Sequence, residues 1–175
     1  PADPGVDILS IIGKFDLPAR FPPEAVAEAS SFPKVELPDN PPGREDLRSE
    51  SIITIDPDTA RDFDDAISLR ELPGGHAEIG IHIADVSHYV TAGSALDQDA
   101  YDRGNSVYFP RRVIPMLPEK LSNGLCSLNP DVDRLAMVCE MSITPRVRSS
   151  VLAPSLTRMV SGRSLMMVRS TPSAP

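Results

Sequence analysis

Apolar residues recur with helical spacing near the start of the chain. Within residues 6–15 they fall three or four positions apart, which predicts a helix, at Ile8, Leu9, Ile11, Ile12 and Phe15. A second helix is expected over residues 23–30, because Pro23 supplies the φ angle that suits a first helical turn. Residues 32–48 are too rich in proline for a regular element, so we expect an extended connection there.

Further along, the apolar positions follow the two-residue period of strands. Residues 52–55 form one expected strand, and residues 66–72 and 77–84 form a hairpin around the turn Pro73-Gly74-Gly75. Residues 135–143 are expected to form a half-buried strand whose alternating apolar side chains share one face, namely Met137, Cys139, Met141 and Ile143.

A short helix is expected between these strands, with Ser94 as its amino-terminal cap and Gly104 just beyond its end. Together the elements predict an α+β fold with a mixed, mainly antiparallel sheet and flanking short helices. The chain shows no internal repeat.

Five aspartates are crowded into the ten residues from Asp56 to Asp65, between two expected strands. Carboxylates a few ångströms apart repel and raise one another's pKa values, and strands at both ends limit how far they can separate. A hard divalent ion such as Mg²⁺, which takes oxygen ligands and accompanies phosphate substrates, would relieve this repulsion. The pattern therefore favours a metal site, with a solvated acidic loop as the alternative.

Carboxylates of this kind can hold two ions about 4 Å apart, which activate a water and stabilise the leaving oxygen in phosphodiester hydrolysis. Asp56, Asp62 and Asp65 are the expected ligands. Asp64 is expected either to orient the attacking water or to complete the second metal shell. Asp58 follows Pro57 and is expected to be an exposed turn residue.

A calcium EF-hand is excluded by the spacing of this segment. Such a loop needs glycine at its sixth position and glutamate at its twelfth. Counting from Asp56, these positions hold Arg61 and Ile67; counting from Asp62, they hold Ile67 and Pro73.

Composition and charge narrow the class of protein. The chain has 175 residues, 19 of them proline, and a net charge of −8 with a pI of 4.8. This charge argues against a surface that coats nucleic acid, although an acidic catalytic site can sit beside domains that supply the basic surface. We find no apolar run of membrane-spanning length and no signal-peptide pattern, so we expect a soluble, cytoplasmic protein without membrane contact.

The remaining reactive side chains are interpreted as structural. Cys126 and Cys139 are expected to be buried reduced thiols. His82 and His88 are expected to form structural hydrogen bonds rather than to bind metal or act as bases, since hard ions prefer oxygen. His76 should be exposed beside the glycine turn. Tyr108 could belong to the core or stack on a nucleotide base, and spacing alone favours the core.

Residues 146–175 differ from the rest, with five arginines, no acidic residue and no regular periodicity. Three interpretations stay open: a basic RNA-binding arm, a disordered end, or a sequence that is not the gene's natural continuation.

Four stretches of the chain closely resemble the catalytic RNB domain of the ribonuclease II and ribonuclease R exoribonucleases. They are residues 54–66, 82–89, 106–110 and 114–130. The resemblance runs from about Arg44 to Thr144 and stops there. We therefore expect a helical, proline-rich linker at residues 1–43, the amino-terminal part of an incomplete RNB-type domain at 44–145, and an atypical tail at 146–175.

The resemblance implies processive 3′→5′ hydrolysis of single-stranded RNA to nucleoside 5′-monophosphates, dependent on Mg²⁺. It places Asp56, Asp62, Asp64 and Asp65 in the active centre, and Asp64 matches an aspartate needed for cleavage rather than for RNA binding. It also implies that Tyr108 stacks near the 3′ end of the RNA.

The family's later half, with a catalytic arginine and glutamate, and its OB-fold RNA-binding domains are not matched here. We therefore expect weak or no activity from this chain. We also expect it to be a monomer. The alternative is a non-catalytic metal- or RNA-binding module derived from such an enzyme.

Overall fold

The structure is a computed structural model that describes residues 6–33, 43–57, 59–110, 112–143 and, by backbone alone, 164–168. Contacts between Cα atoms divide the chain into two units. The helical unit comprises residues 1–34 and 89–122, and the sheet unit comprises residues 35–88 and 123–175. Residues 89–122 thus group with the amino-terminal helices, although the sequence placed them in one segment with the strands.

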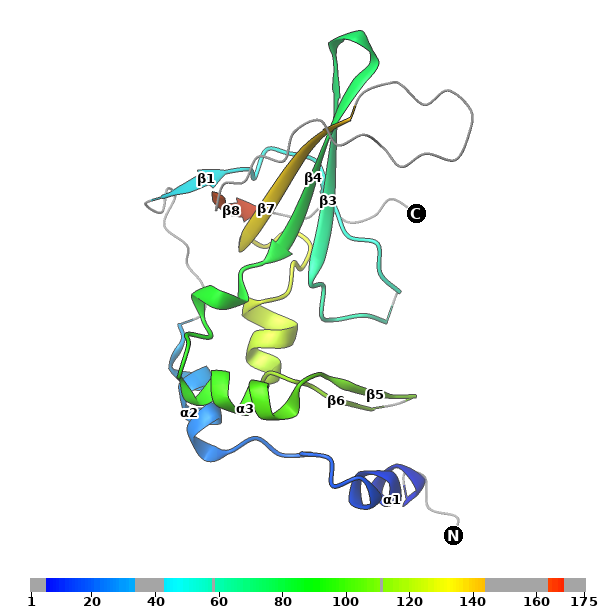
Figure 1. Ribbon diagram of the computed structural model, residues 1–175, viewed down its shortest axis with the longest axis vertical. Coiled ribbons are helices and arrows are strands. Elements are labelled where there is room, and N and C mark those ends of the chain that lie inside the picture. Colours follow the sequence, from blue (N-terminus) through cyan, green and yellow to red (C-terminus); the bar gives the residue numbers. More distant parts are fainter. Residues whose placement is uncertain (1–5, 34–42, 58, 111, 144–163, 169–175) are drawn as a thin grey trace. The chain divides into compact units, whose positions relative to one another are not determined.

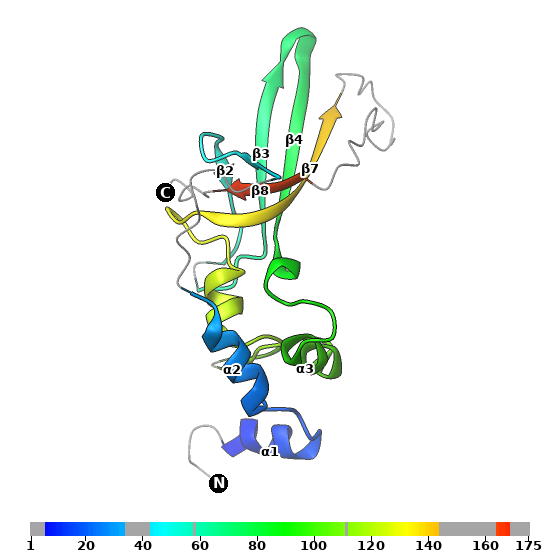
Figure 2. The ribbon, with the colours of Figure 1, turned by 90° about the vertical axis from the view of Figure 1, so that its left-hand side faces the viewer.

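The sheet unit is built on six strands in the order β1-β8-β7-β4-β3-β2 (Figures 1 and 2). Their bounds are β1 (Arg44–Asp46), β2 (Ile52–Ile53), β3 (Asp65–Leu72), β4 (His76–Ala84), β7 (Arg134–Ile143) and β8 (Ser164–Val168). Neighbouring strands are antiparallel except for β1 and β8, which are parallel. The predicted mixed, mainly antiparallel sheet is confirmed.

The hairpin of β3 and β4 forms where the sequence predicted it. Its turn spans Pro73–Gly75, and Gly74 has a φ of 78°, a value that glycine adopts without strain. Gly80 pairs with Ser68 in the ladder, and a Cβ at Gly80 would lie 2.4 Å from the Ser68 hydroxyl. A larger residue at position 80 would therefore displace the side chains of Ser68 and His82.

The helical unit contains α1 (Val6–Lys14), α2 (Pro23–Ser31), α3 (Ala95–Arg103) and a hairpin of β5 (Val107–Phe109) with β6 (Arg112–Ile114). All three predicted helices are confirmed. Ser94 caps α3 by accepting a hydrogen bond from the Asp97 N–H at 3.2 Å, and Gly104 ends the helix with a φ of 75°. A π-helical turn, Leu121–Leu125, follows at the boundary between the units. Every helix within the described residues is too short or too polar to cross a bilayer.

Burial inside the helical unit explains the pairing of α2 with α3. Ala25 and Ala29 are buried on α2, and Leu96 is buried at the start of α3. The Glu28 carboxylate accepts a hydrogen bond from the Leu96 N–H at 2.9 Å. Small side chains let the two helices approach, and the carboxylate satisfies an amide at the start of α3 that has no partner within the helix.

Two strands differ from the sequence prediction at the edges of the sheet. The strand expected over residues 52–55 ends at Ile53, and the side chain of Ile55 is 78% exposed. Residues 32–48 were expected to lack regular structure, yet β1 forms there by pairing with β8. The local sequence could not indicate β1, because its partner strand lies more than a hundred residues away.

The burial of β7 also differs from the prediction. Met137, on the face expected to be buried, is 44% exposed, whereas Ala136 and Val138 on the opposite face are buried. Leu135, on the same face as Met137, is also buried, so both faces are covered at the start of β7, which alternation alone could not show. Cys126 is buried as expected, but Cys139 is only half-buried; both are free thiols.

Arg103 holds the irregular segment before α2 against α3. Its guanidinium donates to the carboxylate of Asp99 at 2.7 Å and to the carbonyls of Pro18 and Arg20 at 2.6 and 2.7 Å. It also lies 3.9 Å from the centre of the Phe21 ring, and the side chain is only 2% exposed. A planar group with five N–H donors can serve all these partners at once.

We therefore expect Arg103→Lys to destabilise the protein, because an ammonium keeps the charge but cannot reach the same carbonyls. The expected loss is about 1.5–3 kcal/mol, the range for hydrogen bonds to a charged group. Urea unfolding would measure it, with Arg112→Lys at an exposed position as the matched control. Equal stabilities of the two variants would contradict this role for Arg103.

His82 is a buried structural histidine, as the sequence interpretation held. Its side chain is 1% exposed, and Nε2 lies 2.9 Å from the Ser68 hydroxyl. Burial lowers the pKa of His82 from 6.5 to about 4, because the imidazolium would lose its hydration.

The lowered pKa predicts acid lability of the fold. Between pH 6.5 and about 4 the unfolded chain binds a proton that folded His82 does not. The contribution of neutral His82 is complete above pH 6.5 and declines toward pH 4, by up to about 3 kcal/mol.

Thermal unfolding from pH 7 to pH 4 would measure this decline in the wild type and in His82→Gln. The variant should lose part of the pH dependence, whereas His76→Gln, at an exposed position, should keep it. The same pH profile for both variants would show that His82 does not contribute.

Candidate functional site

The aspartate loop, defined as residues 54–64, joins β2 to β3, and Asp65 is the first residue of β3. The predicted loop between two strands is thus confirmed. Asp58 lies outside the described residues. Asp62 is half-buried, whereas Asp56, Asp64 and Asp65 are exposed at the surface. All four candidate ligands therefore lie within one segment of the sheet unit.

Backbone hydrogen bonds attach the second half of this loop to its surroundings. The Asp64 carbonyl accepts from the Ala84 N–H at 2.9 Å, at the end of β4, and the Phe63 carbonyl accepts from the Leu128 N–H at 2.8 Å. The Ser127 hydroxyl bonds to the backbone of Arg61 and Phe63. Residues 61–64 are therefore held by hydrogen bonds to the end of β4 and to residues 127 and 128.

Electrostatics show that the carboxylates influence one another. Partial burial, followed by the charges of Asp62, Asp65 and Asp56, raises the pKa of Asp64 above its ordinary value. Partial burial, followed by the charges of Asp65 and Asp62, raises the pKa of Asp56. The charges of these neighbouring carboxylates thus disfavour ionisation of Asp56 and Asp64.

The donor chemistry of the loop fits a hard divalent ion, since four carboxylates offer oxygen ligands that repel one another. Among the described residues, however, no three His, Cys, Asp or Glu side chains lie close enough together to hold a metal ion. Binding would therefore require the carboxylate side chains to converge. The assignment of Asp56, Asp62, Asp64 and Asp65 as ligands stays a prediction.

Tyr108 lies on β5 in the helical unit, and its side chain is 63% exposed. The core position that spacing favoured is therefore wrong. An exposed aromatic ring on a short hairpin is accessible for stacking, which is the role that the resemblance implies.

The other reactive side chains have structural environments. His88 is exposed, and its Nδ1 lies 3.5 Å from Nη2 of Arg44, which pairs with buried Asp85 at 2.9 Å. His76 is exposed beside the glycine turn, as expected. Burial raises the pKa of the Cys126 thiol to about 12, so this thiol is not a nucleophile at neutral pH.

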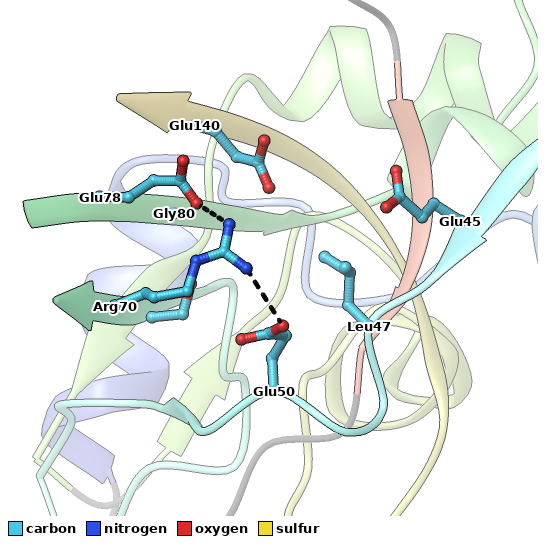
Figure 3. A pocket seen from close by; sticks show the side chains of 8 residues that line it. Glu45, Leu47, Glu50, Arg70, Glu78, Gly80 and Glu140 are labelled. Carbon is cyan, nitrogen blue, oxygen red and sulfur yellow. Dashed lines mark hydrogen bonds and ion pairs between the residues drawn. The ribbon is translucent and has the colours of Figure 1, made fainter. Parts of the chain in front are cut away.

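Sequence reasoning missed a cavity of about 160 Å³ on one face of the sheet unit (Figure 3). It is lined by residues of β1, β3, β4, β7 and the β1–β2 connection, namely Glu45, Leu47, Glu50, Ser68, Arg70, Glu78, Gly80 and Glu140. Arg70 forms ion pairs with Glu78 and, at 3.8 Å, with Glu50. The ladder partners Arg70 and Glu78 could have been found from the hairpin register. None of the candidate aspartates lines this cavity.

The raised pKa of Asp64 predicts that Asp64→Asn stabilises the metal-free protein. Folded Asp64 binds protons more tightly than the unfolded chain does, so its contribution to stability falls as pH rises above about 4. Removing the charge should raise the melting temperature at pH 7 by a small amount, on the order of 1–2 °C, because the exposed carboxylate is screened.

Calorimetry in the presence of a chelator would test this, with Asp97→Asn in α3 as a control outside the loop. A lower melting temperature for Asp64→Asn would contradict the repulsion inferred for the loop.

Comparison with known proteins identifies the family to which the chain belongs. Residues 44–160 match the RNB domain family. The match begins where the motifs begin and extends beyond Thr144, where we expected it to end. Ribonuclease R 1 of Lactococcus lactis is 50% identical over 147 residues, which cover 83% of this chain and 18% of that protein. Ribonuclease R of Thermotoga maritima is 54% identical over 143 residues, which cover 81% of this chain and 20% of that protein.

Among solved structures, Mycoplasma genitalium RNase R in complex with double-stranded RNA aligns with a TM-score of 0.79 and 32% identity. The alignment covers 97% of this chain and 28% of that one. The chain thus spans about a fifth of the length of the two ribonuclease R relatives. Extensive identity and a shared fold lead to one conclusion: this chain belongs to the RNB domain family of ribonuclease R-type proteins.

Proposed function

We propose that this chain carries the catalytic carboxylates of a magnesium-dependent exoribonuclease, which removes nucleoside 5′-monophosphates processively from the 3′ end of single-stranded RNA. The observation that carries the proposal is the aspartate loop, where Asp56, Asp62, Asp64 and Asp65 interact electrostatically at the edge of an RNB-type sheet. Carboxylates that raise one another's pKa values fit a divalent cation that arrives with a phosphate substrate.

In this proposal Asp56, Asp62 and Asp65 hold Mg²⁺, and Asp64 either joins them or accepts a hydrogen bond from the attacking water. Bound Mg²⁺ would supply activation of the water and stabilisation of the leaving oxygen. The water oxygen forms a bond to the terminal phosphorus, and the bond from phosphorus to the preceding 3′ oxygen breaks. The 3′ oxygen takes up a proton, and a nucleoside 5′-monophosphate leaves.

RNA as the ligand is supported by the solved relative, which was determined in complex with RNA. In this chain Tyr108 would stack on a base near the 3′ end, an interaction worth about 1–3 kcal/mol per base. The acidic charge of the chain means that a basic surface for the RNA backbone would come from OB-fold domains of a complete protein. A monomeric state and a cytoplasmic location remain predictions from the sequence.

We expect this chain by itself to cleave RNA weakly or not at all. The family's catalytic arginine and glutamate, which the resemblance places in the later half of the domain, would be needed to stabilise the developing charge. The four motifs described above do not include this arginine and glutamate.

The test is release of 5′-monophosphates from single-stranded RNA with Mg²⁺, comparing the wild type with Asp64→Asn. Any release by the wild type should fall by about 10²-fold or more in the variant, the range for loss of a group that acts on the attacking nucleophile. Because Asp64→Asn should not lower stability, lost activity would not reflect unfolding. Equal release by both proteins would reject the role of Asp64, and turnover equal to that of a complete ribonuclease R would reject the expected weakness.

A second candidate function is a non-catalytic module whose carboxylates bind a structural ion. It is favoured by the observation that the candidate carboxylates are not gathered around one point in the described residues. This candidate predicts that Mg²⁺ raises the melting temperature without any release of monophosphates, an outcome that the same assay would detect.

A further inference from the structure

We infer that Ser127 is a positioning residue for the aspartate loop: its hydroxyl fixes the backbone on both sides of Asp62 and so determines where the carboxylates of Asp62 and Asp64 lie. The inference deepens the proposed function and rests on it, because it assigns a residue that shapes the same metal site. Ser127 is far from the loop in sequence, and its hydroxyl bonds to backbone atoms of the loop.

The hydroxyl of Ser127 makes two hydrogen bonds to the loop backbone. It accepts from the Phe63 N–H at 3.0 Å and donates to the Arg61 carbonyl at 3.0 Å. A hydroxyl has one proton to donate and lone pairs to accept, so both bonds form at once. The next residue, Leu128, donates its N–H to the Phe63 carbonyl at 2.8 Å. Three hydrogen bonds thus join residues 61–63 to residues 127 and 128.

Ser127 is itself held in place by the sheet. Its side chain is completely buried, and its carbonyl accepts a hydrogen bond from Nε of Arg134 at 2.9 Å. Arg134 is the first residue of β7, is buried, and also donates to the Gly124 carbonyl at 2.9 Å. The buried guanidinium of Arg134 therefore connects Ser127, and with it the loop, to β7, a central strand of the sheet.

The effect on the carboxylates follows from the positions of the fixed residues. Asp62 lies between Arg61 and Phe63, both of which bond to Ser127. Asp64 lies between Phe63 and β3, and its carbonyl is bonded to Ala84. The backbone beside both aspartates is thus constrained, while charge repulsion favours their separation. Without the hydroxyl, an amide and a carbonyl of the loop would lose their partner, and the loop could relax away from Leu128.

Groups that orient metal ligands without touching the metal typically contribute 10–100-fold to metal affinity. We therefore expect Ser127→Ala to weaken Mg²⁺ binding by about tenfold or more. Ser127→Thr keeps the hydroxyl and should restore the affinity. Ser94→Ala removes a comparable hydroxyl bond to a backbone amide, at the cap of α3, and should leave Mg²⁺ binding unchanged.

The experiment combines two measurements on the full chain. Amide hydrogen exchange, followed by NMR, should show the Phe63 amide protected in the wild type, exposed to exchange in Ser127→Ala, and protected in Ser94→Ala. Calorimetric titration with Mg²⁺ well below the melting temperature should show the affinity loss in Ser127→Ala alone. Hydrogen exchange in the wild type tests whether the Phe63 N–H is held by a hydrogen bond, even if Ser127→Ala fails to fold.

Fast exchange of the Phe63 amide in the folded wild type would overturn the inference. So would unchanged Mg²⁺ affinity in folded Ser127→Ala, or a loss that Ser127→Thr shares while folded, since packing rather than the hydroxyl would then be responsible. Failure of the wild type to bind Mg²⁺ would instead overturn the proposed metal site. In that case selective loss of Phe63 protection in Ser127→Ala would still support the hydroxyl as the fixing group.

Discussion

Mutual repulsion among the carboxylates of the aspartate loop is the constraint on which the candidate site depends. After partial burial, which is the larger cause, it raises the pKa values of Asp56 and Asp64, and it favours separation of the side chains in the absence of a cation. Hydrogen bonds from Ser127, Leu128 and Ala84 oppose that separation by fixing the backbone. The loop therefore retains a concentrated charge that a divalent ion could neutralise, at some expense to the stability of the metal-free protein.

Buried arginines connect irregular segments to regular elements in both units. Arg134 joins the segment around Ser127 to β7, and Arg103 joins the segment before α2 to α3. In each case a guanidinium donates to backbone carbonyls that no strand or helix would satisfy. This use of arginine suits a chain with 19 prolines, because long connections leave many carbonyls without partners in secondary structure. The same chemistry thus supports the fold and the geometry of the candidate site.

The sheet places the end of the aspartate loop beside the end of β4. β3 begins at Asp65, which pairs with Ile83 near the end of β4, so the end of the aspartate loop is fixed by the hairpin register. The cavity around Arg70 lies further along the same strands, but its ion pairs with Glu50 and Glu78 already compensate the arginine. The cavity, lined by four glutamates and one arginine, is therefore acidic as well, but none of the candidate aspartates lines it.

Local patterns in the sequence were sufficient for the three helices, the β3–β4 hairpin and the loop that carries the aspartates. Each depends on residues near one another in the chain, such as Ser94 and Gly104 at the ends of α3 or the glycines between β3 and β4. The motifs also identified the family and the candidate carboxylates, because those residues lie within a few positions of each other.

Only the tertiary structure decided what depends on distant residues. It showed the parallel pairing of β1 with β8, the exposure of Met137 on β7 and the exposure of Tyr108. It also showed that Ser127 contacts the aspartate loop, although Ser127 and Phe63 are 64 residues apart in the sequence. A contact between a hydroxyl and backbone atoms leaves no periodic or charged signal in the sequence. The sequence by itself determined which carboxylates are available, whereas long-range hydrogen bonds decided how their backbone is held.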